Sequence, residues 1–151
     1  MKRLACRFAV AFAFATPAFA APAFHAAGEA RWTCGGVGAD ERRALDALRP
    51  QSNVELLFVS AERGGYFADA SFAVTAGGRT VVSSENEGPI CLLALPAGAY
   101  RIEARRGDVV RTQSLQVGAK AGVRRVVFAF PGEPWDGINA TEEEKRQARE
   151  P

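Results

Sequence analysis

The sequence Ala70-Ser-Phe-Ala-Val-Thr-Ala-Gly-Gly-Arg-Thr-Val-Val-Ser83 predicts two β-strands joined by a tight turn. Ala70, Phe72 and Val74 alternate with smaller or polar residues, which is the period-two pattern of a strand with one buried face. Gly77-Gly78 follows, and a glycine pair between two such runs is typical of a two-residue hairpin loop. The stretch therefore indicates an antiparallel β-protein.

The same alternation continues on both sides of this hairpin, from Asn53 to Phe130. Short strand-like segments recur about every ten residues and are separated by turns rich in glycine and proline. They predict seven strands, at residues 54–58, 70–75, 79–83, 90–95, 100–105, 109–117 and 123–130. This number and spacing are typical of a seven-stranded antiparallel β-sandwich.

A short helix is predicted before the strands, over residues 39–49. Asp40 and Glu41 stand at its start, where the helix dipole favours negative charge. Its apolar residues lie at helical spacing and form one narrow stripe, and Pro50 marks its end. We expect one mainly β domain over residues 32–131 that includes this helix.

The first 20 residues have the pattern of a secretory signal peptide. Lys2, Arg3 and Arg7 form a basic head, a short apolar segment follows, and Ala18-Phe-Ala20 fits a cleavage site. The alternative is an uncleaved anchor, but the apolar segment is short for a transmembrane helix and Pro17 interrupts it. We therefore expect a periplasmic or secreted bacterial protein that has no transmembrane anchor after cleavage.

Two further segments are expected outside the packed domain. Residues 21–31 are rich in alanine and lack periodicity, which predicts a flexible lead-in. Residues 132–151 are polar and charged, with Thr141 and Glu144 at the spacing of a capping box. This C-terminal segment predicts a mobile charged tail that is disordered or weakly helical.

Removal of the signal peptide changes the net charge of the chain. The 151 residues include 19 Lys and Arg against 17 Asp and Glu, a net charge of +2. The signal removes three basic residues and no acidic one, so the mature chain has a net charge of −1. A nucleic-acid partner needs a basic field in the mature domain, so the composition argues against one.

The cysteine count favours a disulfide bond. Cys6 leaves with the signal peptide, so Cys34 and Cys91 remain in a chain bound for an oxidising compartment. A bond that closes this loop of about 57 residues would stabilise the fold by about 4 kcal/mol in the chain-entropy model. Two free buried thiols are the alternative.

One turn and two flanking segments resemble a known family. Tyr66–Phe72, Ser84–Gly88 and above all Leu93–Ile102 are similar to the carboxypeptidase regulatory-like domain, a transthyretin-like β-sandwich of the immunoglobulin type. The Leu-Pro-x-Gly-x-Tyr turn of that family is matched here by Leu95, Pro96, Gly98 and Tyr100. The resemblance covers about residues 54–130 and implies a fold, not a reaction.

The resemblance also implies how the turn and the cysteines are arranged. Pro96 would fix φ, Gly98 would permit a positive φ, and Leu95 and Tyr100 would be buried on either side of the corner. Cys91 shares the strand parity of the inward-facing leucines, so Cys34 would attach the N-terminal segment to the sheet. That segment, Gly35–Leu48, resembles the opening of small exported bacterial proteins of unknown role.

Catalytic chemistry has little support in this sequence. His25, the single histidine, lies in the expected lead-in, and a pair of bonded cysteines leaves no thiol nucleophile. The chain has no Gly-x-Ser-x-Gly motif, no phosphate-binding loop with lysine and no cluster at metal-ligand spacing. We expect a protein that is not an enzyme and has no catalytic residues, cofactor or metal.

Aromatic residues at loop ends are the candidates for binding. Tyr66 and Phe67 follow a pair of glycines, Trp32 flanks Cys34, and Trp135 begins the tail. Such side chains mark protein or carbohydrate contacts when they are exposed. The alternative is that Trp32 and Phe67 close the ends of the sandwich.

These observations predict a non-enzymatic exported module that binds another protein or an envelope component. A glycan-binding module is the first alternative, and an enzyme with an unrecognised site is the second. A basic patch is a further candidate surface, formed by Arg105, Arg106, Arg124 and Arg125.

Overall fold

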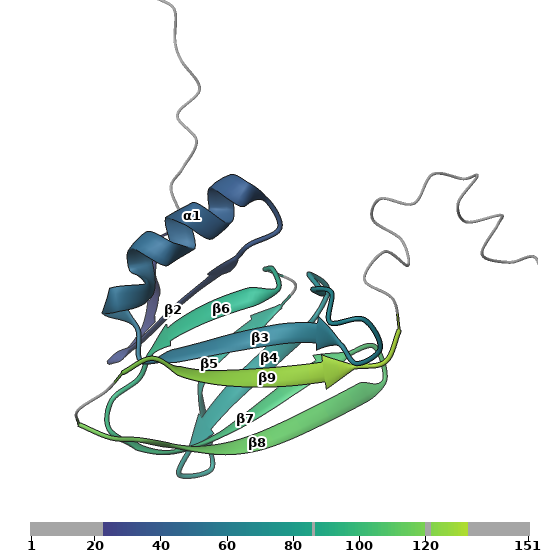
Figure 1. Cartoon of the computed structure of the whole chain (residues 1–151). Coiled ribbons are helices and arrows are strands. Elements are labelled where there is room, and N and C mark those ends of the chain that lie inside the picture. Colours follow the sequence, from purple (N-terminus) through teal and green to yellow (C-terminus); the bar gives the residue numbers. More distant parts are fainter. Residues whose placement is uncertain (1–22, 86, 120–121, 133–151) are drawn as a thin grey trace, which may run out of the picture.

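A computed structural model of the chain describes residues 23–85, 87–119 and 122–132 (Figure 1). These residues are mainly β, with two sheets and one short α-helix. The expected signal peptide at residues 1–20, the tail beyond residue 132 and Trp135 lie outside the described residues.

All seven strands predicted from the alternation are present. They are β3 (Val54–Ser60), β4 (Ser71–Ala76), β5 (Arg79–Glu85), β6 (Ile90–Ala94), β7 (Gly98–Arg106), β8 (Val109–Val117) and β9 (Arg124–Phe130). Their bounds differ from the predicted ones by a few residues at most, because turn residues and side-chain alternation together mark both ends of each strand.

The predicted count of seven is nevertheless wrong, because the described residues form nine strands. The two additional strands are β1 (His25–Ala27) and β2 (Ala30–Gly35). They occupy part of residues 21–31, so the flexible lead-in expected there is also corrected. Every residue of β1 is exposed, so this strand is held by backbone pairing to β2 and leaves no alternating pattern in the sequence.

The strands form a five-stranded sheet A, in the order β1-β2-β6-β3-β9, and a four-stranded sheet B, in the order β5-β4-β7-β8. All neighbours are antiparallel except β3 and β9, which pair in parallel from Val54 with Arg124 to Ser60 with Phe130. The expected all-antiparallel arrangement is therefore corrected. Strands β3 and β9 are the first and the last of the seven predicted strands, so their pairing joins distant parts of the chain.

The main core draws buried side chains from both sheets. The rings of Phe58 on β3 and Phe72 on β4 lie 6.2 Å apart between their centroids, and Phe128 on β9 lies 6.1 Å from Phe58. The same cluster contains inward-facing residues of β6, β7 and β8. Burial of each such large apolar side chain contributes about 1.5–3 kcal/mol, so this cluster is the principal stabilising element of the fold.

Helix α1 (Ala39–Leu48) covers the outer face of sheet A, as Figure 1 shows. It continues into the 3-10 turn η1 (Arg49–Gln51), so the helix predicted over 39–49 is confirmed apart from its last residue. Leu45 packs with Leu57 of β3 and with Ile90 and Leu92 of β6 in a second apolar cluster. Strand β3 is therefore buried on both faces, which explains its nearly continuous apolar sequence.

Candidate functional site

The predicted disulfide bond is present between Cys34 and Cys91. The two residues stand opposite each other on β2 and β6, with their Cα atoms 4.1 Å apart. Cys91 is 1% exposed and belongs to the main core together with Leu93 and Leu95. The alternative of two free thiols is therefore wrong, and the bond attaches the N-terminal strand pair to the rest of sheet A.

The turn Leu95, Pro96, Gly98 and Tyr100 forms a corner that leads from sheet A into sheet B. Leu95 and Tyr100 are buried, at 4% and 8% exposure, and the Tyr100 hydroxyl donates a hydrogen bond of 2.8 Å to the Pro96 carbonyl oxygen. Burial raises the pKa of this hydroxyl, and the charge of Glu29 raises the pKa further. The corner is thus closed by a tyrosine that bonds back to its own chain.

Gly98 does not have the expected positive φ. It is already the first residue of β7, and the Tyr100 ring lies over it, so that an added Cβ would be 3.6 Å from the ring atom Cε2. This is ordinary van der Waals distance. The role expected for Gly98 is corrected, because the chain turns through Pro96 and Ala97 before β7 begins.

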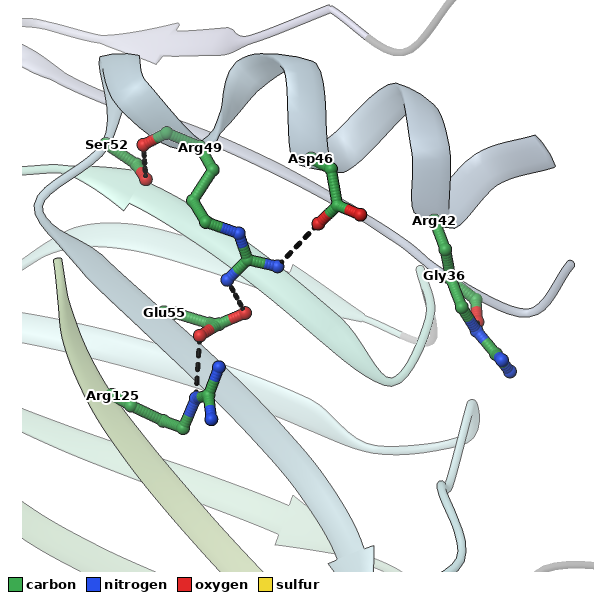
Figure 2. A network of polar contacts seen from close by, with 7 residues as sticks. All are labelled: Gly36, Arg42, Asp46, Arg49, Ser52, Glu55 and Arg125. Atoms are coloured by element: carbon green, nitrogen blue, oxygen red, sulfur yellow. Dashed lines mark hydrogen bonds and ion pairs between the residues drawn. The ribbon is translucent and has the colours of Figure 1, made fainter. Parts of the chain in front are cut away.

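A buried carboxylate forms the most developed polar network among the described residues (Figure 2). The side chain of Glu55 on β3 is 3% exposed and lies on the outer face of sheet A, close to the end of α1. One of its oxygens accepts from Arg49, and the other accepts from the Arg125 Nε of β9 at 2.8 Å. Arg49 also pairs with Asp46 at 2.8 Å, so this network fastens α1 and η1 to β3 and β9.

The network also changes the pKa of Arg49. The hydrogen bonds that Arg49 donates, first to Asp46 and then to Glu55, raise the pKa of its guanidinium above the usual value. Sequence reasoning missed this network, although a single glutamate within the apolar run Val54–Phe58 was the available signal. Both oxygens of Glu55 are occupied by guanidinium donors, so the arrangement suits a structural ion pair.

The aromatic candidates are in different environments. Phe67 is 1% exposed, and the Arg106 guanidinium lies 3.6 Å from the centre of its ring. Trp32 is half-buried against the main core, and its ring centroid is 5.3 Å from that of His25. Both therefore fit the alternative of side chains that close the fold, whereas Tyr66 is 44% exposed.

The structure does not bring Trp32 and Tyr66 together. Trp32 stands opposite Leu93, which stands opposite Val54 at the start of β3. Tyr66 bridges to Val59 near the other end of that strand. Val54 and Val59 are five residues apart on an extended strand, so the positions of Trp32 and Tyr66 are separated by roughly 17 Å along it.

The four arginines of the expected basic patch are also divided. Arg124 and Arg125 begin β9, whereas the Arg106 NH1 donates to the Pro131 carbonyl just beyond its other end. Arg105, Arg106 and Arg125 pair with Glu103, Asp69 and Glu55, respectively. Three of the four charges are thus taken up locally, and the expected common patch is not formed.

The structure places Arg42 beside Tyr66, and the exposed Val37 follows Gly36, to which Arg42 donates a hydrogen bond; Val37, Arg42 and Tyr66 are called here the Tyr66 patch. Val37 is 59% exposed, and the Arg42 guanidinium lies 5.7 Å from the centre of the Tyr66 ring. The patch joins the loop before α1 to the β3–β4 loop. Sequence reasoning found Tyr66 but not the two residues that accompany it.

Hydrogen bonds hold both parts of the Tyr66 patch. The Glu41 carboxylate accepts from the backbone amides of Gly36 and Val37 at 3.0 and 3.1 Å, and the Arg42 Nε donates to the Gly36 carbonyl at 2.9 Å. On the other side, the amide next to Tyr66, that of Phe67, donates to Phe58 of β3 at 3.0 Å. The exposed side chains therefore stand on ordered backbone.

Metal-ion sites and transmembrane helices are the two remaining features of the described residues. Within them, no group of three or more His, Cys, Asp and Glu side chains is placed to hold a metal ion. None of the helical segments in the same part of the chain has the length and apolarity of a transmembrane span. Comparison with protein-family models and with curated proteins finds no match for this chain.

Proposed function

We propose that this chain is an exported, non-enzymatic binding module that contacts another protein or an envelope component through the Tyr66 patch. The observation that carries the proposal is the exposure of Tyr66 beside Arg42 and Val37 on an ordered backbone. Tyrosine and arginine are enriched among residues that dominate binding energy at protein interfaces. An ordered backbone lowers the entropy lost on association.

We further propose that the two sheets form a β-sandwich of the carboxypeptidase regulatory-like, transthyretin-like type. Support comes from the main core, which draws on both sheets, and from the buried corner at Leu95 and Tyr100. A tyrosine hydroxyl that bonds to backbone a few residues upstream is also a feature of immunoglobulin-type sandwiches. Strands β1 and β2 would then be an addition to the common fold.

The absence of enzymatic activity is part of the same proposal. Both cysteines of the described chain are bonded to each other, and His25 lies against Trp32. The buried carboxylate of Glu55 is already shared between two guanidinium groups. The reactive groups that the sequence offers are thus engaged in structural contacts.

The glycan-binding alternative has weaker support. Sugar-binding surfaces use exposed aromatic faces, but Phe67 is buried and Trp32 is half-buried. Among the aromatic candidates that the structure describes, Tyr66 is the one with an open ring, and the neighbouring Arg42 and Val37 suit a protein surface better. A protein partner is therefore the function that we propose first.

Site-specific photocrosslinking in intact cells tests this proposal. A photoreactive residue at Val37 should give a discrete crosslinked product in the envelope, and the same residue at Thr112, exposed on β8, should not. Tyr66→Ser, which keeps the hydrogen bond from Arg42 to Gly36, should remove that product while leaving the melting temperature nearly unchanged. Equal products from both positions, or a product that survives this substitution, would contradict the proposed surface.

A further inference from the structure

An open depression of about 620 Å³ lies on sheet B, at the end where the β4–β5 hairpin turns. Part of its lining consists of residues with little or no side chain, namely Gly77, Gly78 and Ala99. A Cβ added to either glycine would meet no atom within 4 Å, so the space beside the turn is open. The hollow therefore arises where the turn has no side chains and β7 has a small one.

The polar lining belongs to the outer face of the sheet. Thr75, Arg101 and Ser114 alternate with buried residues of β4, β7 and β8, and the strand register places them side by side in one row. Gln116 adds an amide group from the end of β8. The row therefore supplies two hydroxyl groups next to one guanidinium.

A second guanidinium comes from the other sheet. Arg124, the first residue of β9, also lines the depression, and its NH1 donates to the Gln116 carbonyl at 3.4 Å. Neither Arg101 nor Arg124 makes an ion pair with any other residue of the described ranges. Two uncompensated cations therefore meet at one hollow.

No acidic side chain lines this hollow in the described part of the chain. Glu103, two residues beyond Arg101 on the same face of β7, is 3.6 Å from Arg105 and is engaged there. Glu29 is close enough to act on the charge state of Tyr100, but it does not belong to the lining. The local field is thus positive.

We propose that this depression binds a small ligand through an oxyanion, carboxylate or phosphate, held between Arg101 and Arg124. The planar guanidinium group forms two parallel hydrogen bonds with a pair of oxygens of a carboxylate or of a phosphate. The Ser114 hydroxyl would bond to a neighbouring polar group of the ligand, and the Thr75 hydroxyl, which already donates to the Arg101 carbonyl at 3.2 Å, would accept from one. The volume is in the range of small-molecule sites, and the openness of the hollow leaves the rest of the ligand in solvent.

This inference is independent of the proposed function. Arg124 pairs with Val54 at the start of β3, whereas Tyr66 bridges to Val59 near the end of that strand. The hollow and the Tyr66 patch are therefore at opposite ends of the molecule, and either site can be lost without the other.

Isothermal titration calorimetry on the purified chain tests the inference, with glucuronate, inorganic phosphate and glucose as probes at constant ionic strength. Saturable binding of one molecule of glucuronate or phosphate is expected, with no binding of glucose. Tighter binding of glucuronate would identify a carboxylate ligand, and tighter binding of phosphate would identify a phosphate ligand. Arg101→Gln and Arg124→Gln should each weaken that binding by about tenfold or more, since each removes a charge-assisted contact.

Arg111 lies on β8 of the same sheet, outside the lining of the hollow, and pairs with no carboxylate of the described residues. Arg111→Gln is therefore the matched control and should leave binding unchanged, whereas Arg101→Lys should weaken binding even though it keeps the charge. Equal losses in Arg101→Gln and Arg111→Gln would show general surface attraction and overturn the site. Binding of glucose as tight as that of glucuronate, or no saturable binding of either anion to the folded chain, would also overturn it.

Discussion

Glu55 on sheet A and Glu103 on sheet B both face arginine from the outer side of a sheet, but only one of these groups is covered. The Glu55 side chain is 3% exposed and bonds to Arg49 and Arg125. The Glu103 side chain is 44% exposed and lies 3.6 Å from Arg105. The same residue types thus form a structural anchor where α1 and η1 lie over the sheet, and an ordinary surface pair where nothing covers it.

This difference extends to the two sheets as a whole. Sheet A carries the disulfide bond, the helix and the buried carboxylate, each of which ties a separate segment to its centre. Sheet B relies on the shared core and keeps its outer face open, and that face contains the cationic depression. The same type of substitution should therefore lower the free energy of unfolding more on sheet A than on sheet B.

The largest expected effect is loss of the disulfide bond of sheet A. Cys34→Ala with Cys91→Ala should lower the free energy of unfolding by about 4 kcal/mol, because the unfolded chain regains the freedom of a long loop. The melting temperature should fall on the order of 10–20 °C. Thermal denaturation with and without dithiothreitol measures the change, and the double variant should not respond to the reductant. A melting curve that stays the same after reduction is verified by mass would contradict this assignment.

The next largest effect is expected at Glu55, and its size is to be compared with that of the same substitution at Glu103. Glu55→Gln should destabilise the fold by about 2–3 kcal/mol, since it leaves two guanidinium groups without their shared carboxylate. This figure is below that of a fully buried pair because the Arg125 side chain is 61% exposed. Urea denaturation gives the value. A loss below about 1 kcal/mol would mean that coverage by the helix does not isolate the network from solvent.

A smaller effect is expected at the corner that leads into sheet B. Tyr100→Phe removes the hydrogen bond to Pro96 and should cost about 1 kcal/mol near neutral pH. The raised pKa of Tyr100 adds a pH dependence. Its contribution to stability is complete below the ordinary pKa of about 10 and decreases above it, where the unfolded chain loses the proton before the folded chain does.

Denaturant midpoints measured between about pH 8 and pH 11 test this dependence. The original chain should lose stability above about pH 10 more steeply than Tyr100→Phe, so the two curves should converge. Parallel curves would show that another group is responsible for the alkaline loss.

The smallest effect is expected at the exposed pair of sheet B. Glu103→Gln should change the free energy of unfolding by less than about 0.5 kcal/mol, because solvent already screens this pair. The same urea measurement that is used for Glu55→Gln provides the comparison. If both substitutions cost the same, the contrast between a covered and an open sheet face would be wrong.

Local patterns predicted much of the fold. The alternation around Phe72 and Val74 and the glycine pair at Gly77 located a hairpin correctly, and the even cysteine count predicted the disulfide bond. Each of these signals comes from residues that are close in sequence or unique in type. The helix before Pro50 was predicted for the same reason.

Features that depend on distant partners were not predicted. Strand β1 is exposed on both faces, so its side chains do not alternate between apolar and polar. Its backbone pairing with β2 leaves no signal in the sequence. The parallel pairing of β3 with β9 depends on how the chain alternates between sheets. Glu55 meets an arginine 70 residues away, and the cationic depression joins Arg101 to Arg124 from another sheet. Tyr66 could be identified as a candidate from its position in a loop, but only the fold shows that Arg42 lies beside it.

The pairing of β3 with β9 has a consequence for the order of folding. Strand β3 is synthesised early, yet its neighbour β9, at the edge of sheet A, is the last strand of the described chain. Contacts that span so much sequence form slowly, because a long loop must close first. Sheet A therefore cannot be completed before the last strand of the described chain is available.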